Sequence, residues 1–134
     1  MSGGFVDLEP EVEALLVEEG FSEPIFLGMI AENAAKKVIL IETGPFGGPK
    51  PAETPVDPHQ IRIMTRDDDP KVALDLLLSI LNKLHGRTPG KFHATSNLFL
   101  LSAFTDERPQ RADNDDRDLA QYFATVLFRV KPLT

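Results

Sequence analysis

The segment from Asp67 to Gly86 constrains the fold more than any other part of the chain. Its opening residues Asp67-Asp68-Asp69-Pro70 predict a helix start, because Asp is a favoured N-cap and Pro fits the first helical position. Gly86 predicts the stop. Apolar residues cover more than half of the circumference of the predicted helix, Pro70–His85, so we expect it to be covered on more than one side. Its narrow polar strip consists of Lys71, Asp75, Ser79 and Asn82.

Strands are predicted on both sides of this helix. Gln60–Arg66 precedes it and alternates in apolar character. Asn97–Phe104 follows it and is apolar on both faces, so we expect its second face to be buried under a helix or against a neighbouring chain. The stretch Thr105–Asp118 is polar and is predicted to be a loop. Leu119–Lys131 is predicted to be the last strand.

The first part of the chain predicts one helix and two short strands. Leu8–Glu19 has acidic residues and a proline in its first turn and a glycine after its end, which is typical of a helix. Pro24–Gly28 and Val38–Ile41 are apolar runs that predict strands. Gly44–Pro58 is dense in proline and glycine and predicts a long loop, and loops of this length are usually functional or disordered.

The order of these elements predicts an α+β fold. Strands are too few for a doubly wound sheet, so we expect a mainly antiparallel sheet with two helices packed on it. The chain has 134 residues, of which 42% are hydrophobic and 26% charged, and no break in composition marks a second domain. Residues 1–134 are therefore predicted to form a single small domain around one core.

Charge and cysteine content exclude several classes of function. The formal net charge is −7, which argues against binding DNA or an anionic membrane through a broad basic surface. There are no cysteines, so disulfides, thiolate zinc sites and thiol nucleophiles are excluded. No apolar stretch is long enough to span a bilayer, and the first residues lack the pattern of a signal peptide. We expect assembly in the cytoplasm and no membrane partner.

Two segments approach known binding motifs without completing them. Gly44–Pro51 aligns with a P-loop, but Pro49 and Pro51 stand where the second glycine and the Ser or Thr are required. Asp113–Asp118 aligns with the start of an EF-hand loop, but Ala124 stands where the bidentate glutamate belongs. A solvated loop is the preferred interpretation of the second segment. We therefore expect no nucleotide cofactor and no bound metal.

No arrangement of residues predicts catalysis. The histidines His59, His85 and His93 are far apart in sequence and form no HExxH motif, and no serine lies in a GxSxG elbow. His85 falls in the last turn of a predicted helix, which favours a structural role. The expected set of catalytic, cofactor-binding and metal-binding residues is empty, and an enzyme is not expected.

One part of the sequence resembles a known family. The strand His59–Arg66, the acidic helix start and the apolar helix ending in Leu84-His85-Gly86 resemble the central unit of tail terminator (tail completion, or head–tail joining) proteins of long-tailed bacteriophages. Asp118–Val126 is similar to the closing strand of those proteins. The resemblance covers about Val56 to Val130.

This resemblance implies a structural virion protein of the phage tail and neck. Such proteins form a ring, usually a homohexamer, that caps the completed tail tube and provides the interface to the head connector. The implied partners are further copies of the chain, the tail tube protein and the head-closure or connector protein, while DNA passes through without specific binding. The candidate interface residues are Phe46, Val56, Arg62, Arg66, Phe99 and Leu101. The candidate channel-facing acidic residues are Asp113, Asp115, Asp116 and Asp118.

Two alternatives remain open at this point. The chain could be another neck or connector component, such as a head-closure or adaptor protein, which would also lack catalytic residues. It could instead be a small ligand-binding or enzymatic domain, with a pocket built from His59, Arg62 and Arg66.

Overall fold

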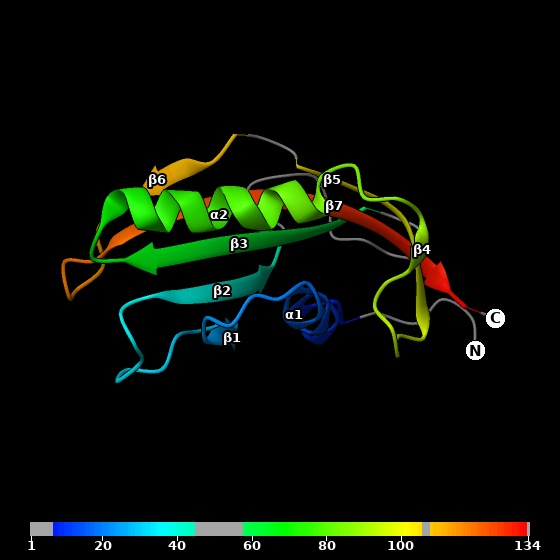
Figure 1. Cartoon of the computed structure of the whole chain (residues 1–134), viewed down its shortest axis with the longest axis horizontal. Coiled ribbons are helices and arrows are strands. Elements are labelled where there is room, and N and C mark those ends of the chain that lie inside the picture. Colours follow the sequence, from blue (N-terminus) through cyan, green and yellow to red (C-terminus); the bar gives the residue numbers. More distant parts are fainter. Residues whose placement is uncertain (1–6, 45–57, 106–107, 134) are drawn as a thin grey trace.

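A seven-stranded sheet with two helices makes up the described part of the protein (Figure 1). The structure, a computed structural model, describes residues 7–44, 58–105 and 108–133. The elements in chain order are α1 (Glu9–Glu18), β1 (Ile25–Leu27), β2 (Val38–Thr43), β3 (His59–Asp67), α2 (Pro70–Leu84), β4 (Gly90–Lys91), β5 (Leu98–Thr105), β6 (Gln110–Ala112) and β7 (Ala120–Pro132). The predicted α+β class is confirmed.

The sheet is antiparallel except at one edge. Its strand order is β1-β2-β3-β7-β5-β4, and β6 also pairs with β7. Only β1 and β2 run parallel. The long strands β3 and β7 form the centre, with Ile63 opposite Ala124. A mainly antiparallel sheet of this kind can leave one face for water or for a partner.

Both helices begin and end within one residue of the predicted bounds, Leu8–Glu19 and Pro70–His85. Asp69 is the N-cap of α2, and its side chain accepts a hydrogen bond of 2.9 Å from the backbone N–H of Lys71. Gly86 follows α2 with φ +71°, and Gly20 follows α1 with φ +100°, values that favour glycine. The helix starts and stops are therefore set by local sequence.

The end of α2 also closes part of the edge of β5. The N–H of Gly86 donates to the carbonyl oxygen of Ala103 at 2.7 Å, and the Thr105 N–H donates to Nδ1 of His85 at 2.9 Å. The His85 ring meets the Phe104 ring edge-on, with 5.6 Å between centroids. These contacts agree with the structural role expected of His85.

The sheet covers only one side of α2. The helix packs on β3, β7 and β5, and it buries Ala73, Leu76, Leu77, Ile80, Leu81 and Leu84. Leu78 on another side is 40% exposed. The expectation that this helix is covered on more than one side is therefore not met by the described part of the chain, because one sheet face and one helix meet along a single stripe.

The polar stretch after β5 was wrongly predicted to be only a loop. It contains strand β6, in which Gln110 pairs with Phe123 and Ala112 with Gln121 of β7. Backbone hydrogen bonds to a long neighbouring strand hold this segment, although its polar side chains give no strand pattern. The two-residue strand β4, paired with β5, was also missed, because it is too short to show alternation.

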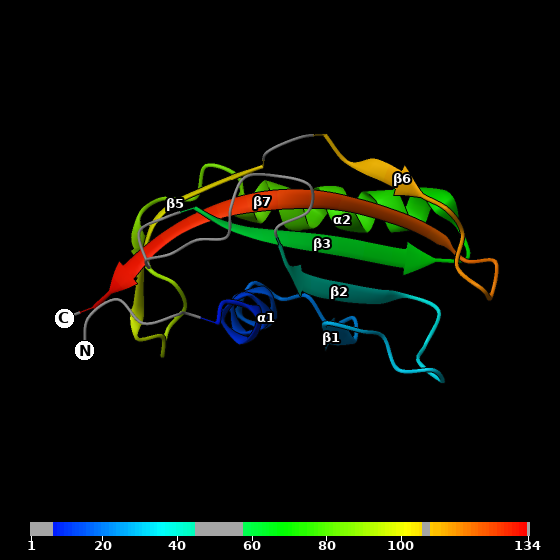
Figure 2. The ribbon, with the colours of Figure 1, turned by 180° about the vertical axis from the view of Figure 1, so that it is seen from behind.

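The two faces of the sheet differ in what covers them. Helix α1 packs on β1 and β2, α2 packs on β3, β5 and β7, and residues of both helices join the same core cluster as Ile41 and Ile63. Both helices therefore lie on the same face. Figure 2, seen from behind, shows β3 and β7 in front of α2. We call the opposite side the helix-free face, because neither described helix covers it.

Candidate interaction surface

The helix-free face is apolar across several strands. Residues on alternate positions of each strand share a face, and the strand register aligns these positions across the sheet. The large apolar side chains placed on the helix-free face in this way are Phe26, Leu40, Met64, Phe99, Phe104, Phe123 and Leu127. Leu40 is buried, whereas Phe104 is 52% exposed. A solvated sheet face normally carries polar residues at these positions.

Cations lie over the aromatic rings of this face. The guanidinium carbon of Arg62 is 4.7 Å from the centroid of the Phe123 ring, and Nζ of Lys131 is 5.3 Å from that of Phe99. Arg129 is exposed and lies opposite Ser102 of β5. Glu42, the cross-strand neighbour of Arg62, is the only carboxylate among the described strand residues of this face. The surface is therefore aromatic and cationic, although the chain is acidic.

Arg66 ties two loops together at one end of the helix-free face. Its Nη1 donates to Oδ2 of Asp115 at 3.0 Å, its Nε to the carbonyl oxygen of Lys36 at 3.1 Å, and its Nη2 to that of Ala35 at 2.6 Å. The side chain is only 6% exposed. Arg66 was a candidate interface residue, but its guanidinium is used inside the chain, where it joins the β1–β2 connection to the β6–β7 turn.

The acidic turn before β7 contains two kinds of carboxylate. Asp115 pairs with Arg66, and its Oδ1 also accepts from the backbone N–H groups of Arg117 at 3.0 Å and Leu119 at 2.8 Å. This side chain holds the turn together. Asp113, Asp116 and Asp118 are exposed. The channel-facing role of all four residues stays a prediction.

A serine, a histidine and a glutamate meet at the junction of α1 with the β4–β5 turn. Ser96 Oγ donates a short hydrogen bond to Glu11, whose Oε1 lies 3.2 Å from Nε2 of His93. Both groups approach the same carboxylate, and none of the described contacts joins the serine to the imidazole. A hydrolytic triad requires the histidine to take the serine proton, so this cluster has a structural arrangement that fastens the turn to α1.

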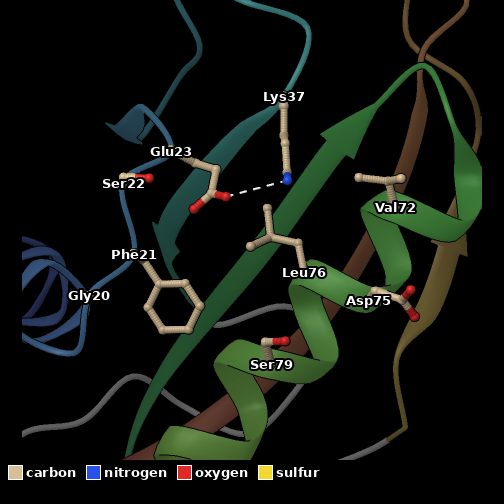
Figure 3. Close-up of a pocket in the computed structure, with 9 residues that line it drawn as sticks. All are labelled: Gly20, Phe21, Ser22, Glu23, Lys37, Val72, Asp75, Leu76 and Ser79. Carbon is tan, nitrogen blue, oxygen red and sulfur yellow. Dashed lines mark ion pairs between the residues drawn. The ribbon is translucent and has the colours of Figure 1, made fainter.

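A hollow between α2 and the connection from α1 to β1 also lacks catalytic geometry. It is lined by Phe21 and Leu76, and Figure 3 shows the Lys37 side chain directed toward Glu23 at its rim. The Lys37 Nζ and the Glu23 carboxylate are 3.4 Å apart, so these two charges neutralise each other. The other polar residues of this lining are Ser22, Ser79 and Asp75, which pairs with Lys71.

Within residues 7–44, 58–105 and 108–133, neither a cluster of metal ligands nor a membrane-spanning helix is present. No group of three or more His, Cys, Asp or Glu side chains in these ranges is arranged to hold a metal ion. No helix of the described chain is long and apolar enough to cross a membrane.

Two of the remaining predicted site residues lie on β5, and two lie outside the described residues. Phe99 is half-buried beneath Lys131, and Leu101 lies at an irregularity of β5, where the pairing with β7 shifts between Leu100 and Ser102. Phe46 and Val56, with most of the predicted loop Gly44–Pro58, lie outside the described residues.

The three residues of the alternative pocket, His59, Arg62 and Arg66, do not share one face of the described sheet. His59 lies at a position of β3 that faces α2 by alternation, whereas Arg62 and Arg66 lie on the other face. Sequence reasoning also missed Phe104, Leu127 and Arg129 as surface residues. An alternation count on both faces of β7, instead of on its buried face only, would have identified Leu127 and Arg129.

Comparison with known proteins adds no family assignment. No protein-family model matches the chain, and no curated protein matches its sequence significantly. Function is therefore inferred from the residues of this chain, in particular from an aromatic and cationic sheet face and from polar clusters that serve the fold.

Proposed function

We propose that this chain is a tail terminator, a structural virion protein that forms a ring on the end of the completed phage tail tube and offers a surface to the head connector. The resemblance of His59–Gly86 and Asp118–Val126 to that family supports the proposal. The observation that carries it is the helix-free face, because a small domain that leaves such a face without a helix is suited to bind other protein chains.

The physical reason lies in the cost of apolar surface in water. Burial of apolar area contributes about 25 cal/mol per Å². Exposed apolar patches on monomers mark interaction sites. Among the described large apolar side chains of this face, Phe104 is exposed, Leu40 is buried and the others are partly buried. Phe104 and Leu127 are cross-strand neighbours on this face, and Phe123 lies on the same side of β7. A second protein layer would complete the packing that α1 and α2 provide on the other face.

The polar groups support an assembly role without chemistry. The described ionisable residues with the most buried contacts, Arg66 and Asp115, hold loops together. His93 and Ser96 share the Glu11 carboxylate and form no nucleophile–base pair. The proposed role in assembly involves no catalysis and no cofactor.

The acidic turn fits a role beside DNA in transit. Asp113, Asp116 and Asp118 are exposed, and repetition around a ring would make a negative band. Such a band on the channel wall would repel the phosphate backbone and let DNA pass without binding. The channel-facing orientation of the acidic turn is part of the ring proposal and depends on it.

The test is whether the protein binds tube ends and assembles there. Purified protein is incubated with tail tubes of the same virus that lack a terminator, and separately with DNA-filled heads. Electron microscopy and mass measurement should then show a multi-subunit ring at one end of the tube. A chain that stays monomeric alone and with tubes would end the terminator proposal, while binding to heads alone would favour a head-closure or adaptor protein, the second candidate.

A further inference from the structure

We infer that the outer surface of α1 in one copy docks on the helix-free face of the next copy. This inference rests on the proposed function, and it names the two surfaces that would meet between neighbours in the ring. The occupant of the helix-free face is a second copy of this chain, because the two surfaces are complementary in both apolar character and charge.

The outer surface of α1 has an apolar centre with acidic neighbours. Val17 is 59% exposed, although it is apolar, and it lines a shallow groove with Pro10 and Ala14. Glu13 and Glu18 line the same groove. The buried side of the helix, in contrast, is wholly apolar. The exposed side of α1 therefore offers an apolar contact flanked by negative charge.

The helix-free face offers the matching arrangement. Phe104 supplies an exposed apolar centre, and Leu127 is its direct cross-strand neighbour. Arg129 and Lys131 are exposed at the same end of β7. Protein interfaces join an apolar centre to a polar rim, and opposite charges across the rim steer the partners and fix their register. The acids beside Val17 and the cations beside Phe104 meet this requirement.

The placement of the two surfaces determines the symmetry of the contact. Helix α1 packs on one face of the sheet through Val12, Leu15 and Leu16, so its outer surface looks away from that face. The helix-free face looks in the opposite direction. A contact between two different surfaces leaves one of each unused at the ends of a pair, so it repeats head to tail. The repeat closes into a ring when the rotation between neighbours allows it and otherwise gives an open filament.

Single-stranded nucleic acid is the competing occupant of the helix-free face. Aromatic rings and cations together also suit stacked bases and phosphates. That alternative gives no role to the exposed Val17 or to the acids around it, whereas a second copy uses both surfaces. Binding of an oligonucleotide is therefore included as an outcome of the test.

Engineered cysteines test the contact directly, because the natural chain has none. Val17→Cys and Phe104→Cys variants are mixed and treated with a short bis-maleimide reagent, alone and on tail tubes. We expect cross-linked pairs that contain one copy of each variant. The control mixes Val17→Cys with Leu78→Cys, since Leu78 is also an exposed apolar residue but lies on α2. Its yield should be several-fold lower.

Charge exchange provides the second arm. Glu13→Lys with Glu18→Lys in one variant, and Arg129→Glu with Lys131→Glu in another, should each abolish assembly. A mixture of the two should assemble again, because every contact then joins opposite charges. Lys36→Glu with Lys71→Glu is the matched control: both lysines are exposed outside the two surfaces, and the control should assemble like the natural chain. Thermal unfolding verifies that each variant is folded.

The outcomes separate this inference from the proposed function. A ring that forms on tubes, while the charge variants assemble normally or only the Leu78 control cross-links, overturns the inference and leaves the terminator proposal intact. A natural chain that is monomeric alone and with tubes overturns both. Tight binding of single-stranded oligonucleotide that is lost in the Arg129 and Lys131 variant, without self-association, assigns the face to nucleic acid and also overturns the inference.

Discussion

The two faces of the central sheet are built from adjacent residues of the same strands and have different surroundings. Ile63 of β3 is fully buried in the core that both helices cover, and the next residue, Met64, is only partly buried on the helix-free face. Both positions are apolar. Apolar alternation therefore identifies which residues share a face but does not reveal which face the chain covers by itself.

The two faces of the sheet should therefore contribute to different properties, one to the stability of the single chain and the other to assembly. Side chains beneath α1 and α2 contribute to the free energy of folding of one chain, because they leave water when that chain folds. On the helix-free face, Leu40 is already buried in the single chain, whereas the exposed Phe104 leaves water only when another molecule arrives. The helix-covered face should therefore respond to substitution in unfolding experiments, and the other face in assembly experiments.

Paired substitutions in β3 give the largest expected difference between the faces. Ile63→Ala should lower the free energy of unfolding by about 2–5 kcal/mol, because it leaves a cavity in a closed core. Met64→Ala should cost less than about 1.5 kcal/mol, since its side chain is already partly exposed. Urea denaturation of both variants measures these losses, and equal losses would mean that the helix-free face is as closed as the other.

Substitution of Arg66 measures whether one end of the helix-free face contributes to the stability of the single chain. Arg66→Ala should cost about 3 kcal/mol, because it leaves the partly buried Asp115 without its cation and two backbone carbonyl groups without their donor. Lys71→Ala, which removes an exposed pair with Asp75, should cost no more than about 1 kcal/mol. Urea denaturation again provides the measurement. A loss for Arg66→Ala no greater than that for Lys71→Ala would contradict the structural role of the arginine.

Substitution of the N-cap residue of α2 measures how much this cap contributes to stability, since α2 covers the buried face of the sheet. Asp69→Ala should lower stability by about 1 kcal/mol, because the Lys71 N–H loses its acceptor. Asp68→Ala is the control at the neighbouring exposed position, where a hydrogen bond from Lys36 lowers the pKa of the carboxyl below its ordinary value. The control should change the thermal midpoint less than Asp69→Ala does, and the reverse order would show that Asp68 is the effective cap.

The acidic turn should give the smallest change in stability. Asp113→Asn, Asp116→Asn and Asp118→Asn combined should shift the free energy of unfolding by less than about 0.5 kcal/mol, because all three residues are exposed. Asn also tolerates the positive φ of 61° at Asp118. If the turn lines the channel, assembled virions should eject DNA more slowly. Normal ejection kinetics would place the turn outside the channel.

Local signals explain why most of the fold could be predicted from sequence. Asp69, Pro70 and Gly86 act within a few residues of their own position, so the bounds of α2 follow from them. Strand β6 could not be predicted in this way, because its pairing with β7 depends on contacts with another part of the chain.

The candidate surface was harder to predict than the fold for the same physical reason. Arg62 and Arg66 look equivalent in sequence, but only the structure brings Asp115 and two backbone carbonyl groups to Arg66. His59 shares their strand and lies on the opposite face. Phe104 stands in a uniformly apolar run, and its exposure depends on which helices pack where.

The junction of α2 with β5 affects how the protein aggregates on heating. An open strand edge is a template for strand addition and aggregation, and the backbone contacts of His85 and Gly86 occupy this edge at Ala103 and Thr105. Fraying of the last turn of α2 would free that edge before the rest of the sheet melts. Irreversible aggregation on warming should therefore begin below the global unfolding temperature. Its onset temperature should fall in variants that destabilise the last turn of α2.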